Sequence, residues 1–339
     1  MKKILTLNRG TNISHWLSQS EKRGIERKEY FKETDIKIIK DLGFDHIRLP
    51  FDEEQLWDIN GKLDSEACNL LEDALTWCDR AKLKVVLDFH ILRTHYFNDK
   101  NVPLLFTKPS ETERFINLWL EFSERFKKVP ETLAAYEILN EPVAPLNEDW
   151  NRIAIQVFNA IRKAEPERTI LLGSNRFNSV ETFLDLEVPQ DDLCILTFHF
   201  YHPMFITHYK AKWWDGGVYE GPISYPGRPI PEENWNSLDI DFRKRFEKEN
   251  EPFDPDKIRL LLEKPLKVRE KTKCPLYCGE FGCYHSVPSD ISIKWYSDVL
   301  EVFNKNSIGW ANWDYKGGFG IINKEGVRSP IIKVMMNYI

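Results

Sequence analysis

Two glutamates each stand at the end of a short apolar run, and this arrangement suggests paired-carboxylate chemistry. Residues 134–142 read Ala-Ala-Tyr-Glu-Ile-Leu-Asn-Glu-Pro, and residues 275–282 read Pro-Leu-Tyr-Cys-Gly-Glu-Phe-Gly. Both runs predict buried strands, and Pro142 ends the first strand because it cannot donate to a sheet. Glu141 and Glu280 are therefore expected at strand ends, where α/β barrels carry their catalytic groups. Two such glutamates are what a retaining glycosidase needs, one as acid/base and one as nucleophile.

The elements that must hold these glutamates alternate along the chain. Strand patterns occur at residues 6–13, 45–50, 85–90, 134–141, 169–175, 194–201, 275–282 and 309–314. Apolar residues at helical spacing occur at residues 33–42, 64–78, 111–128, 150–164, 255–271, 289–304 and 329–338. Strands that alternate with helices, without a second type of composition, predict one (β/α)₈ TIM barrel over residues 1–339.

The alternation breaks after the sixth strand, where residues 203–254 have no place in the barrel. This stretch holds the aromatic residues Trp213, Trp214, Tyr219, Tyr225 and Trp235. Loops of this length without secondary structure are uncommon in compact domains. We therefore expect a small inserted subdomain on the catalytic face, with a short surface helix within residues 239–250.

Composition excludes several classes of partner. The net charge is −6 and no block of Lys or Arg is present, so we expect no nucleic acid or anionic membrane partner. No run of about 18 apolar residues occurs, which predicts no membrane-spanning helix. The first residues form no export signal, so the sequence leaves the localisation open. We expect a monomer.

The six cysteines lie mostly inside apolar runs and predict reduced, buried thiols. Cys274, Cys278 and Cys283 lie close together in the sequence, but no CxxC pair or suitably spaced His accompanies them. Structural zinc is therefore not expected. We predict no metal and no cofactor.

Six of the predicted strands end in polar or aromatic side chains. These side chains are Arg48, His90, Asn140 with Glu141, His199 with Tyr201, Glu280 and Trp313. Because the ends of parallel barrel strands meet on one rim, this repetition predicts a single site. Aromatic faces can stack on the C–H faces of sugar rings, which suits a carbohydrate ligand.

The same residues resemble a known enzyme family. Arg9-Gly10-x-Asn12, Arg48-Leu49-Pro50, Leu139-Asn140-Glu141-Pro142, His199-Phe200-Tyr201, Gly279-Glu280-Phe281-Gly282 and Trp313 match glycoside hydrolase family 5 in order and spacing. Within that family the chain is most similar to small single-domain bacterial endoglucanases, over nearly its whole length. The resemblance implies a retaining β-glycosidase with Glu141 as acid/base and Glu280 as nucleophile.

Physical chemistry is consistent with these roles. A retaining pair must stand about 5–5.5 Å apart. Glu280 must stay ionised, and Arg48 and the Tyr201 hydroxyl are donors that can hold its pKa down. Glu141 must be protonated near neutral pH, so it needs a drier setting with the Glu280 charge nearby.

The residues expected to bind the sugar are Arg48, His90, Asn140, His199, Tyr201 and Trp313. Asn140 would hydrogen-bond the 2-OH, His90 and His199 would contact hydroxyls, and Trp313 would form the floor under the cleaved sugar. Each has a structural alternative: Arg48 could neutralise Asp88, and the histidines and Trp313 could be packing residues. Glu137 competes as the acid but is expected deeper in the barrel as a partner for an Arg. Weaker candidates for sugar contact are Trp16, His95, Tyr96, Phe205, Trp213 and Trp214.

Rival functions remain open at this point. A metal-dependent barrel hydrolase would use the histidines as ligands, but it usually needs His-x-His on its first strand, and this strand carries Arg9-Gly10-Thr11-Asn12. A sugar-binding protein without activity would use the same aromatic residues. Among glycosidases, the resemblance favours an enzyme acting on β-1,4 and mixed β-1,3-1,4 glucans as oligo- or polysaccharides. A β-mannanase, an exo-β-1,3-glucanase or a β-glucosidase would use the same machinery.

Overall fold

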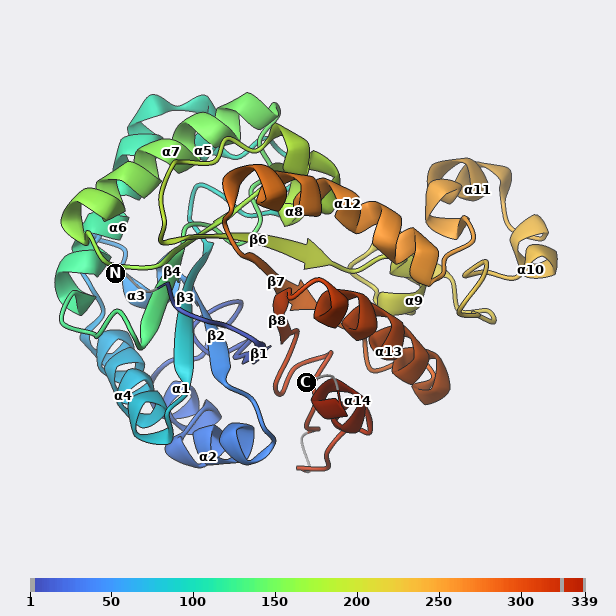
Figure 1. Cartoon of the computed structure of the whole chain (residues 1–339), viewed down its shortest axis with the longest axis horizontal. Coiled ribbons are helices and arrows are strands. Elements are labelled where there is room, and N and C mark those ends of the chain that lie inside the picture. The colour runs from blue at the N-terminus through green and yellow to red at the C-terminus, as the bar shows by residue number, and fades with distance from the viewer. Residues whose placement is uncertain (1–3, 324–325, 338–339) are drawn as a thin grey trace.

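The computed structural model of the chain describes residues 4–323 and 326–337, and a barrel of eight parallel strands closes at its centre (Figure 1). The strands follow one another round the barrel in chain order, and β1 pairs with β8. The predicted (β/α)₈ barrel is confirmed. The strands are β1 (Arg9–Asn12), β2 (His46–Asp52), β3 (Lys84–Ile91), β4 (Ala134–Glu137), β5 (Ile170–Gly173), β6 (Cys194–Phe200), β7 (Leu276–Phe281) and β8 (Gly309–Asn312).

Helices connect the strands on the outside of the barrel (Figure 1). The longer ones are α2 (Glu33–Asp41), α4 (Ser65–Ala81), α6 (Pro109–Phe126), α7 (Asn147–Ala164), α12 (Pro255–Thr272) and α13 (Ser289–Lys305). Short elements are α1 (Gly24–Tyr30), α3 (Glu53–Leu56), α5 (Leu104–Thr107), α8 (Asn175–Asn178), η1 (Val180–Asp185), α9 (Met204–Thr207), η2 (Asp215–Val218), α10 (Glu232–Asn236), α11 (Ile240–Phe246), η3 (Lys248–Asn250) and α14 (Ile331–Asn337). Between β5 and β6 the described chain forms only α8 and η1 in place of a long helix.

Amphipathic patterning explains why the helices cover the barrel. On α7 the buried apolar side chains recur at intervals of three and four residues, so that one face meets the sheet. They are Trp150, Ile153, Ala154, Val157, Phe158 and Ile161. The strands are buried on both faces, as expected of a parallel sheet covered by helices. Inside the barrel a separate cluster forms from Leu5, Leu7, Val86, Ala135, Leu171, Ile195, Tyr277 and Ala311.

Most of the predicted strands are longer than the observed ones, and the first and the fourth differ most. The first strand was predicted at residues 6–13, but β1 begins at Arg9 because Leu5 and Leu7 turn into the barrel's inner cluster. The fourth was predicted to reach Glu141, but β4 ends at Glu137. Beyond β4 the chain still forms isolated hydrogen bonds to the neighbouring strands. Asn140 N donates to Phe89 O of β3 at 3.0 Å. This bond holds Asn140 at the barrel rim.

The segment between β6 and α12 leaves the barrel and lies at one edge of the molecule, where Figure 1 shows α10 and α11 beyond α9. Its aromatic side chains pack around Phe205, whose ring lies near those of Trp214, Tyr219, Trp235, Phe242 and Phe246. The helix predicted within residues 239–250 is present but shorter, as α11. The Asp239 carboxylate caps it by accepting from Asp241 N at 2.8 Å.

Candidate active site

Glu141 and Glu280 meet across the barrel mouth. Glu280 lies on β7, and Glu141 follows the end of β4. One carboxylate oxygen from each, together with a ring nitrogen of His199, lies within 4.8 Å of the other two atoms. This separation is far shorter than the roughly 6.5–9.5 Å that an inverting pair needs for an intervening water. The geometry therefore suits direct attack by one carboxylate and proton transfer by the other.

A buried arginine lies beneath the two glutamates. Arg48 Nη1 donates to Glu280 Oε1 at 2.9 Å, and Nη2 donates to Asn140 Oδ1 at 2.8 Å. Nε donates to Glu137 Oε2 at 2.7 Å, and Nη2 lies 3.1 Å from Asp88 Oδ2. Glu137 as a buried partner of an Arg is therefore confirmed, and the alternative pairing of Arg48 with Asp88 occurs as well.

Arg48 was predicted to bind substrate directly, and the structure corrects this prediction. Its side chain is fully buried and does not line the cavity at the barrel mouth. Its donors are already used by protein carboxylates and amides. Three carboxylates outweigh the effect of burial and raise the pKa of Arg48 well above its usual value. Arg48 is thus a fixed positive charge that positions Glu280 and Asn140.

Burial raises the pKa of both glutamates. For Glu141 the negative charge of Glu280 adds to burial, so its pKa lies well above that of a free glutamate. For Glu280 burial also raises the pKa, while Arg48, His90 and the Tyr201 hydroxyl oppose the rise. A depressed pKa was expected for Glu280, and this expectation was wrong because removal of the carboxylate from water outweighs its donors. The surroundings of the two carboxyls still differ: the charge of Glu280 adds to the rise in the pKa of Glu141, whereas Arg48 and the Tyr201 hydroxyl oppose the rise for Glu280. This difference is the one expected between an acid and a nucleophile.

Strand β6 and the residue that follows it supply one partner to each glutamate. His199 Nδ1 lies 2.7 Å from Glu141 Oε1, and the Tyr201 hydroxyl donates to Glu280 Oε2 at 3.0 Å. Burial and the positive charge of Arg48 hold the pKa of His199 well below its usual value. The ring is therefore neutral near neutral pH.

His90 and Trp313 form a stacked pair on the other side of the mouth. Their ring centroids are 5.6 Å apart with an interplanar angle of 2°. His90 Nδ1 lies 2.7 Å from Asp88 Oδ2, which fixes the ring, and burial lowers the pKa of His90 to about 3. Trp313 directly follows β8 and lines the cavity. The pair thus presents a flat apolar surface beside Glu280.

A cavity of about 830 Å³ joins these residues. It is lined by all the predicted site residues except Arg48, namely His90, Asn140, Glu141, His199, Tyr201, Glu280 and Trp313. Of the weaker aromatic candidates, Tyr96, Trp213 and Trp214 also line it. Trp16, His95 and Phe205 do not, because each is buried in packing contacts.

Several lining residues were missed by the sequence reasoning. They are His15, Gln19, Phe97, Asn98, Arg176, Phe177, Ser179, Glu181, His202, Met204, His208, Tyr284, Gly318 and Phe319. The polar end of the fifth strand, which leads to Arg176 and Phe177, was a signal of the kind used for the other strands. Phe319 and Tyr284 gave no such signal, because only the fold brings their loops to the cavity.

The structure also gives one group of side chains that could ligate a cation. Among the described residues, Glu141, His199 and Glu280 have ligand atoms close enough for a metal ion. The same atoms make the hydrogen bonds of the paired-carboxylate site, and Arg48 already supplies its positive charge.

All six cysteines are free and buried. No helix in the described part of the chain is long and apolar enough to cross a membrane.

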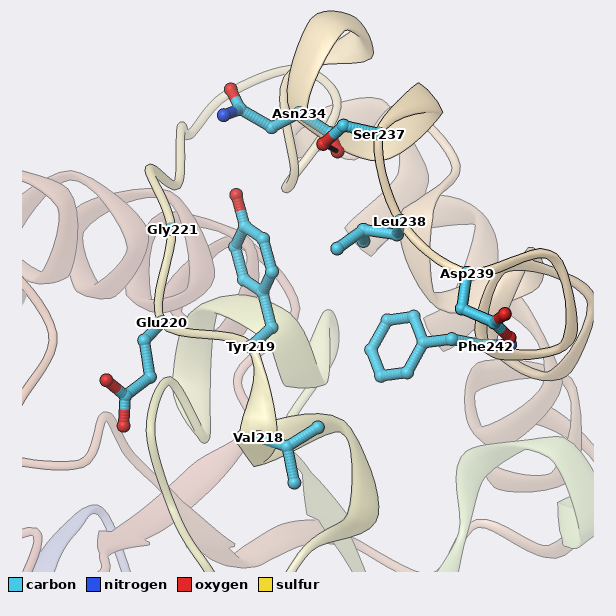
Figure 2. Close-up of a pocket in the computed structure, with 9 residues that line it drawn as sticks. All are labelled: Val218, Tyr219, Glu220, Gly221, Asn234, Ser237, Leu238, Asp239 and Phe242. Atoms are coloured by element: carbon cyan, nitrogen blue, oxygen red, sulfur yellow. Dashed lines mark hydrogen bonds between the residues drawn. The ribbon is translucent and has the colours of Figure 1, made fainter.

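A second, smaller hollow of about 450 Å³ lies in the segment between β6 and α12 (Figure 2). Tyr219 stands on one side of it, and Leu238 and Phe242 face the ring from the other side (Figure 2). Its lining shares no residue with that of the larger cavity. It is therefore separate from the paired glutamates.

Comparisons with known proteins agree with this geometry. The cellulase family (glycosyl hydrolase family 5) matches residues 10–318. Endoglucanase C of Acetivibrio thermocellus is 32% identical over 342 residues, which cover 98% of each protein. Cellodextrinase A of Ruminococcus flavefaciens is 30% identical over 311 residues, covering 91% of this chain and 85% of that protein. The structure of Thermotoga maritima Cel5A in complex with mannotriose is similar with a TM-score of 0.75 at 25% identity, covering 98% of this chain and 97% of that one.

Proposed function

This chain belongs to the cellulase family, glycosyl hydrolase family 5, and we propose that it is a retaining endo-β-glucanase whose catalytic residues are Glu141 and Glu280. Its substrates are β-1,4 and mixed β-1,3-1,4 glucans. The observation that carries this proposal is the close approach of the two glutamates, each with a different hydrogen-bonding partner. Their separation leaves no room for the water of an inverting reaction.

Glu280 acts as the nucleophile. Arg48 and Tyr201 each bind one of its oxygens, at 2.9 and 3.0 Å, and so fix the carboxylate and stabilise its negative charge. In the first step a Glu280 oxygen forms a bond to the anomeric carbon while the bond to the glycosidic oxygen breaks. The product is a covalent glycosyl-enzyme.

Glu141 acts as the general acid and then as the general base. A neutral His199 can donate its Nδ1 hydrogen to Glu141 Oε1, 2.7 Å away, which leaves Oε2 to carry the acidic proton. That proton passes to the departing oxygen in the first step. In the second step Glu141 accepts a proton from the water that attacks the anomeric carbon and releases Glu280.

The other lining residues hold the sugar. The Asn140 carbonyl oxygen accepts from Arg48, so its amide hydrogens are free to donate to the 2-OH. Trp313, backed by His90, offers its face to the sugar that Glu280 attacks. Arg48 contributes indirectly by positioning Glu280 and Asn140.

A panel of polysaccharides tests the substrate class. We expect reducing ends to be released from carboxymethylcellulose and lichenan faster than from mannan or laminarin, with a rapid fall in viscosity that marks internal cleavage. Faster release from mannan would make the protein a β-mannanase. Release of single glucose units without a fall in viscosity would indicate exo action. Full activity in excess chelator is expected, and its loss would favour the metal-dependent alternative.

The pH dependence tests which glutamate carries the proton. Activity requires ionised Glu280 and protonated Glu141. We therefore expect kcat/KM to decrease at pH values below the pKa of Glu280 and at pH values above the pKa of Glu141. Because burial and the charge of Glu280 raise the pKa of Glu141 well above the usual value, the basic limb should lie well above the pKa of a free glutamate. Since the carboxyls interact, the apparent values belong to the pair. Glu141→Gln should flatten the basic limb for a substrate with an activated leaving group.

A basic limb that persists in Glu141→Gln would assign it to another group in the cavity. The candidate is His202, which lines the cavity and lies 3.1 Å from Glu181. Burial lowers the pKa of His202, but the hydrogen bond and charge of Glu181 outweigh burial, so the pKa is raised. His202→Gln separates the two explanations, because it should leave the basic limb in place if Glu141 sets it.

Residues 203–254 form a subdomain that walls one side of the cleft. The aromatic cluster around Phe205 gives this segment a small core of its own. From it Met204, His208, Trp213 and Trp214 reach the cavity lining, and the Trp213 side chain is 57% exposed. An exposed tryptophan in a cleft is suited to stacking on a sugar of the bound chain.

Replacement of residues 212–249 with a Gly/Ser linker tests this role. We expect kcat/KM on lichenan to fall far more than kcat/KM on a small aryl β-glycoside, because the wall supplies binding energy remote from the bond that is cleaved. The single change Trp213→Ala should reproduce part of this difference. Equal losses on both substrates, in a variant that still unfolds cooperatively, would show that the segment instead holds the catalytic residues in place.

A further inference from the structure

An unusual backbone turn projects two side chains into the catalytic cavity. Within α8, Arg176 has φ 54° and ψ 66°, and Phe177 has φ 63° and ψ 36°; the next residue, Asn178, has φ 56°. These values lie in the left-handed region, which L-residues other than glycine avoid because Cβ approaches the following carbonyl oxygen. Three such residues in succession form a left-handed turn that the surrounding structure must hold.

Buried asparagines on both sides hold this turn. The Asn175 side chain accepts from Ala144 N at 2.8 Å and donates to Ala144 O at 3.0 Å. Asn178 Oδ1 accepts from Ser174 N at 3.1 Å, and the Asn178 side chain occupies the space beside Gly173 that a Cβ there would fill. The turn is thus anchored at both ends by these asparagine side chains.

The turn is also attached directly to the loop of the acid/base. Phe177 N donates to Pro142 O at 3.1 Å, one residue after Glu141. Ser179 forms a parallel bridge with His199, which bonds Glu141. The turn is therefore fixed in position relative to the acidic proton, as an element that contacts the departing part of the substrate would need to be.

The two projecting side chains are free to bind a ligand. Phe177 is 49% exposed and Arg176 is exposed, and both line the cavity. Within the described residues, the Arg176 guanidinium has no hydrogen-bond or ion-pair partner and the Phe177 ring stacks on no other ring. Strained backbone conformations persist mainly where function needs them. Here the strain keeps a phenyl face and a five-donor cation in the cavity.

We propose that Phe177 and Arg176 form the subsite for the leaving-group sugar, with Phe177 stacked on the C–H face of that sugar and Arg176 hydrogen-bonded to its hydroxyls. This inference rests on the proposed function. Around the closed barrel β5 is next to β4 and across from β1, whereas Trp313 follows β8, which is next to β1. A glucan whose attacked sugar lies on Trp313 therefore passes Glu141 and leaves over the turn after β5.

The test compares substrates that differ in their leaving group. Phe177→Gly removes the ring and also relieves the left-handed strain, because glycine adopts this conformation freely, so the melting temperature should not fall. We expect kcat/KM on cellotetraose to drop roughly tenfold or more relative to that on β-cellobiosyl fluoride, since burial of a phenyl ring is worth about this factor. The leaving group of β-cellobiosyl fluoride is a fluoride ion, which contains no sugar that could contact the turn.

Transfer to an added sugar gives a second readout. With β-cellobiosyl fluoride as donor and cellobiose as acceptor, the acceptor 4-OH takes the place of water, gives its proton to Glu141 and yields cellotetraose. Phe177→Gly and Arg176→Gln should both lower the ratio of cellotetraose formed to fluoride released, and Phe177→Tyr should restore it. Leu184→Ala, which removes a 55% exposed side chain outside the cavity lining, is the matched control and should change neither readout.

Two outcomes distinguish failure of the proposed subsite from failure of the proposed function. If the unaltered protein released neither fluoride nor cello-oligosaccharides, the proposed function would fail. If the unaltered protein turned over both substrates and Phe177→Gly lowered both equally, without a change in the transfer ratio, the subsite would be wrong and the function would stand.

Discussion

Glu280→Ala is expected to reduce turnover of every β-glucan to near background, whatever the leaving group. In the proposed mechanism this carboxylate forms the bond to the anomeric carbon, and neither Arg48 nor Tyr201, which bind its two oxygens, can replace it. Removal of a covalent nucleophile lowers kcat by several orders of magnitude in other enzymes. The measurement is kcat on lichenan and on a dinitrophenyl β-cellobioside.

Azide distinguishes loss of the nucleophile from general damage to the site. In Glu280→Ala, azide can enter the space of the carboxylate and attack the anomeric carbon, which gives an α-glycosyl azide with inverted configuration. Glu181→Ala, which removes another carboxylate of the same cavity, is the control and should reduce kcat far less. An α-glycosyl azide from Glu141→Ala in place of Glu280→Ala would show that the two roles are reversed.

Glu141→Ala should separate substrates by their need for a proton. On polysaccharides kcat/KM should fall by about 10²–10⁴-fold, the usual contribution of a general acid. A dinitrophenyl leaving group departs without protonation, so formation of the glycosyl-enzyme should be nearly spared. The second step still lacks its base, because the substitution removes the carboxylate that accepts the proton of the attacking water. The intermediate should therefore accumulate.

Intact-protein mass spectrometry measures that intermediate as a mass increase of one cellobiosyl group. Azide should accelerate its breakdown and give a β-glycosyl azide, because azide then attacks the face from which the leaving group departed. Glu137→Gln provides a control for the other carboxylate of this strand, which lies deeper and bonds Arg48 at 2.7 Å. A trapped intermediate in Glu137→Gln, without one in Glu141→Ala, would transfer the acid/base role to Glu137.

The sequence alone predicted the barrel, which the structure confirms, and it singled out two glutamates that the structure brings together. Apolar runs alternating with amphipathic helices are local patterns, and the barrel is the architecture that buries strands on both faces. Polar residues at strand ends then had to gather on one rim. Alternation along the fourth strand also placed Glu137 and Glu141 on one side at different depths, and the bond from Arg48 to Glu137 follows from this difference.

Other features needed the tertiary structure because they depend on what closes around a residue. Arg48 was placed in the site by its sequence, but its burial beneath three carboxylates changes it from a substrate contact into a positioning residue. The pKa of Glu280 was expected to be low from its donors, whereas its removal from water raises it. Desolvation depends on every neighbour in space, and no single stretch of sequence contains that information.

The aromatic side chains illustrate the same division. Trp16 and Trp213 are both tryptophans in loops at the catalytic face, yet one is buried and hydrogen-bonded to Arg27 O while the other is 57% exposed in the cavity. The left-handed turn that presents Phe177 contains no glycine, so the sequence gives no signal for its conformation. Its conformation is imposed by hydrogen bonds to residues 142–147, which the barrel brings next to it. The sequence thus determined the strands and the polar residues at their ends, and the closure of the barrel decided which side chains line the cavity.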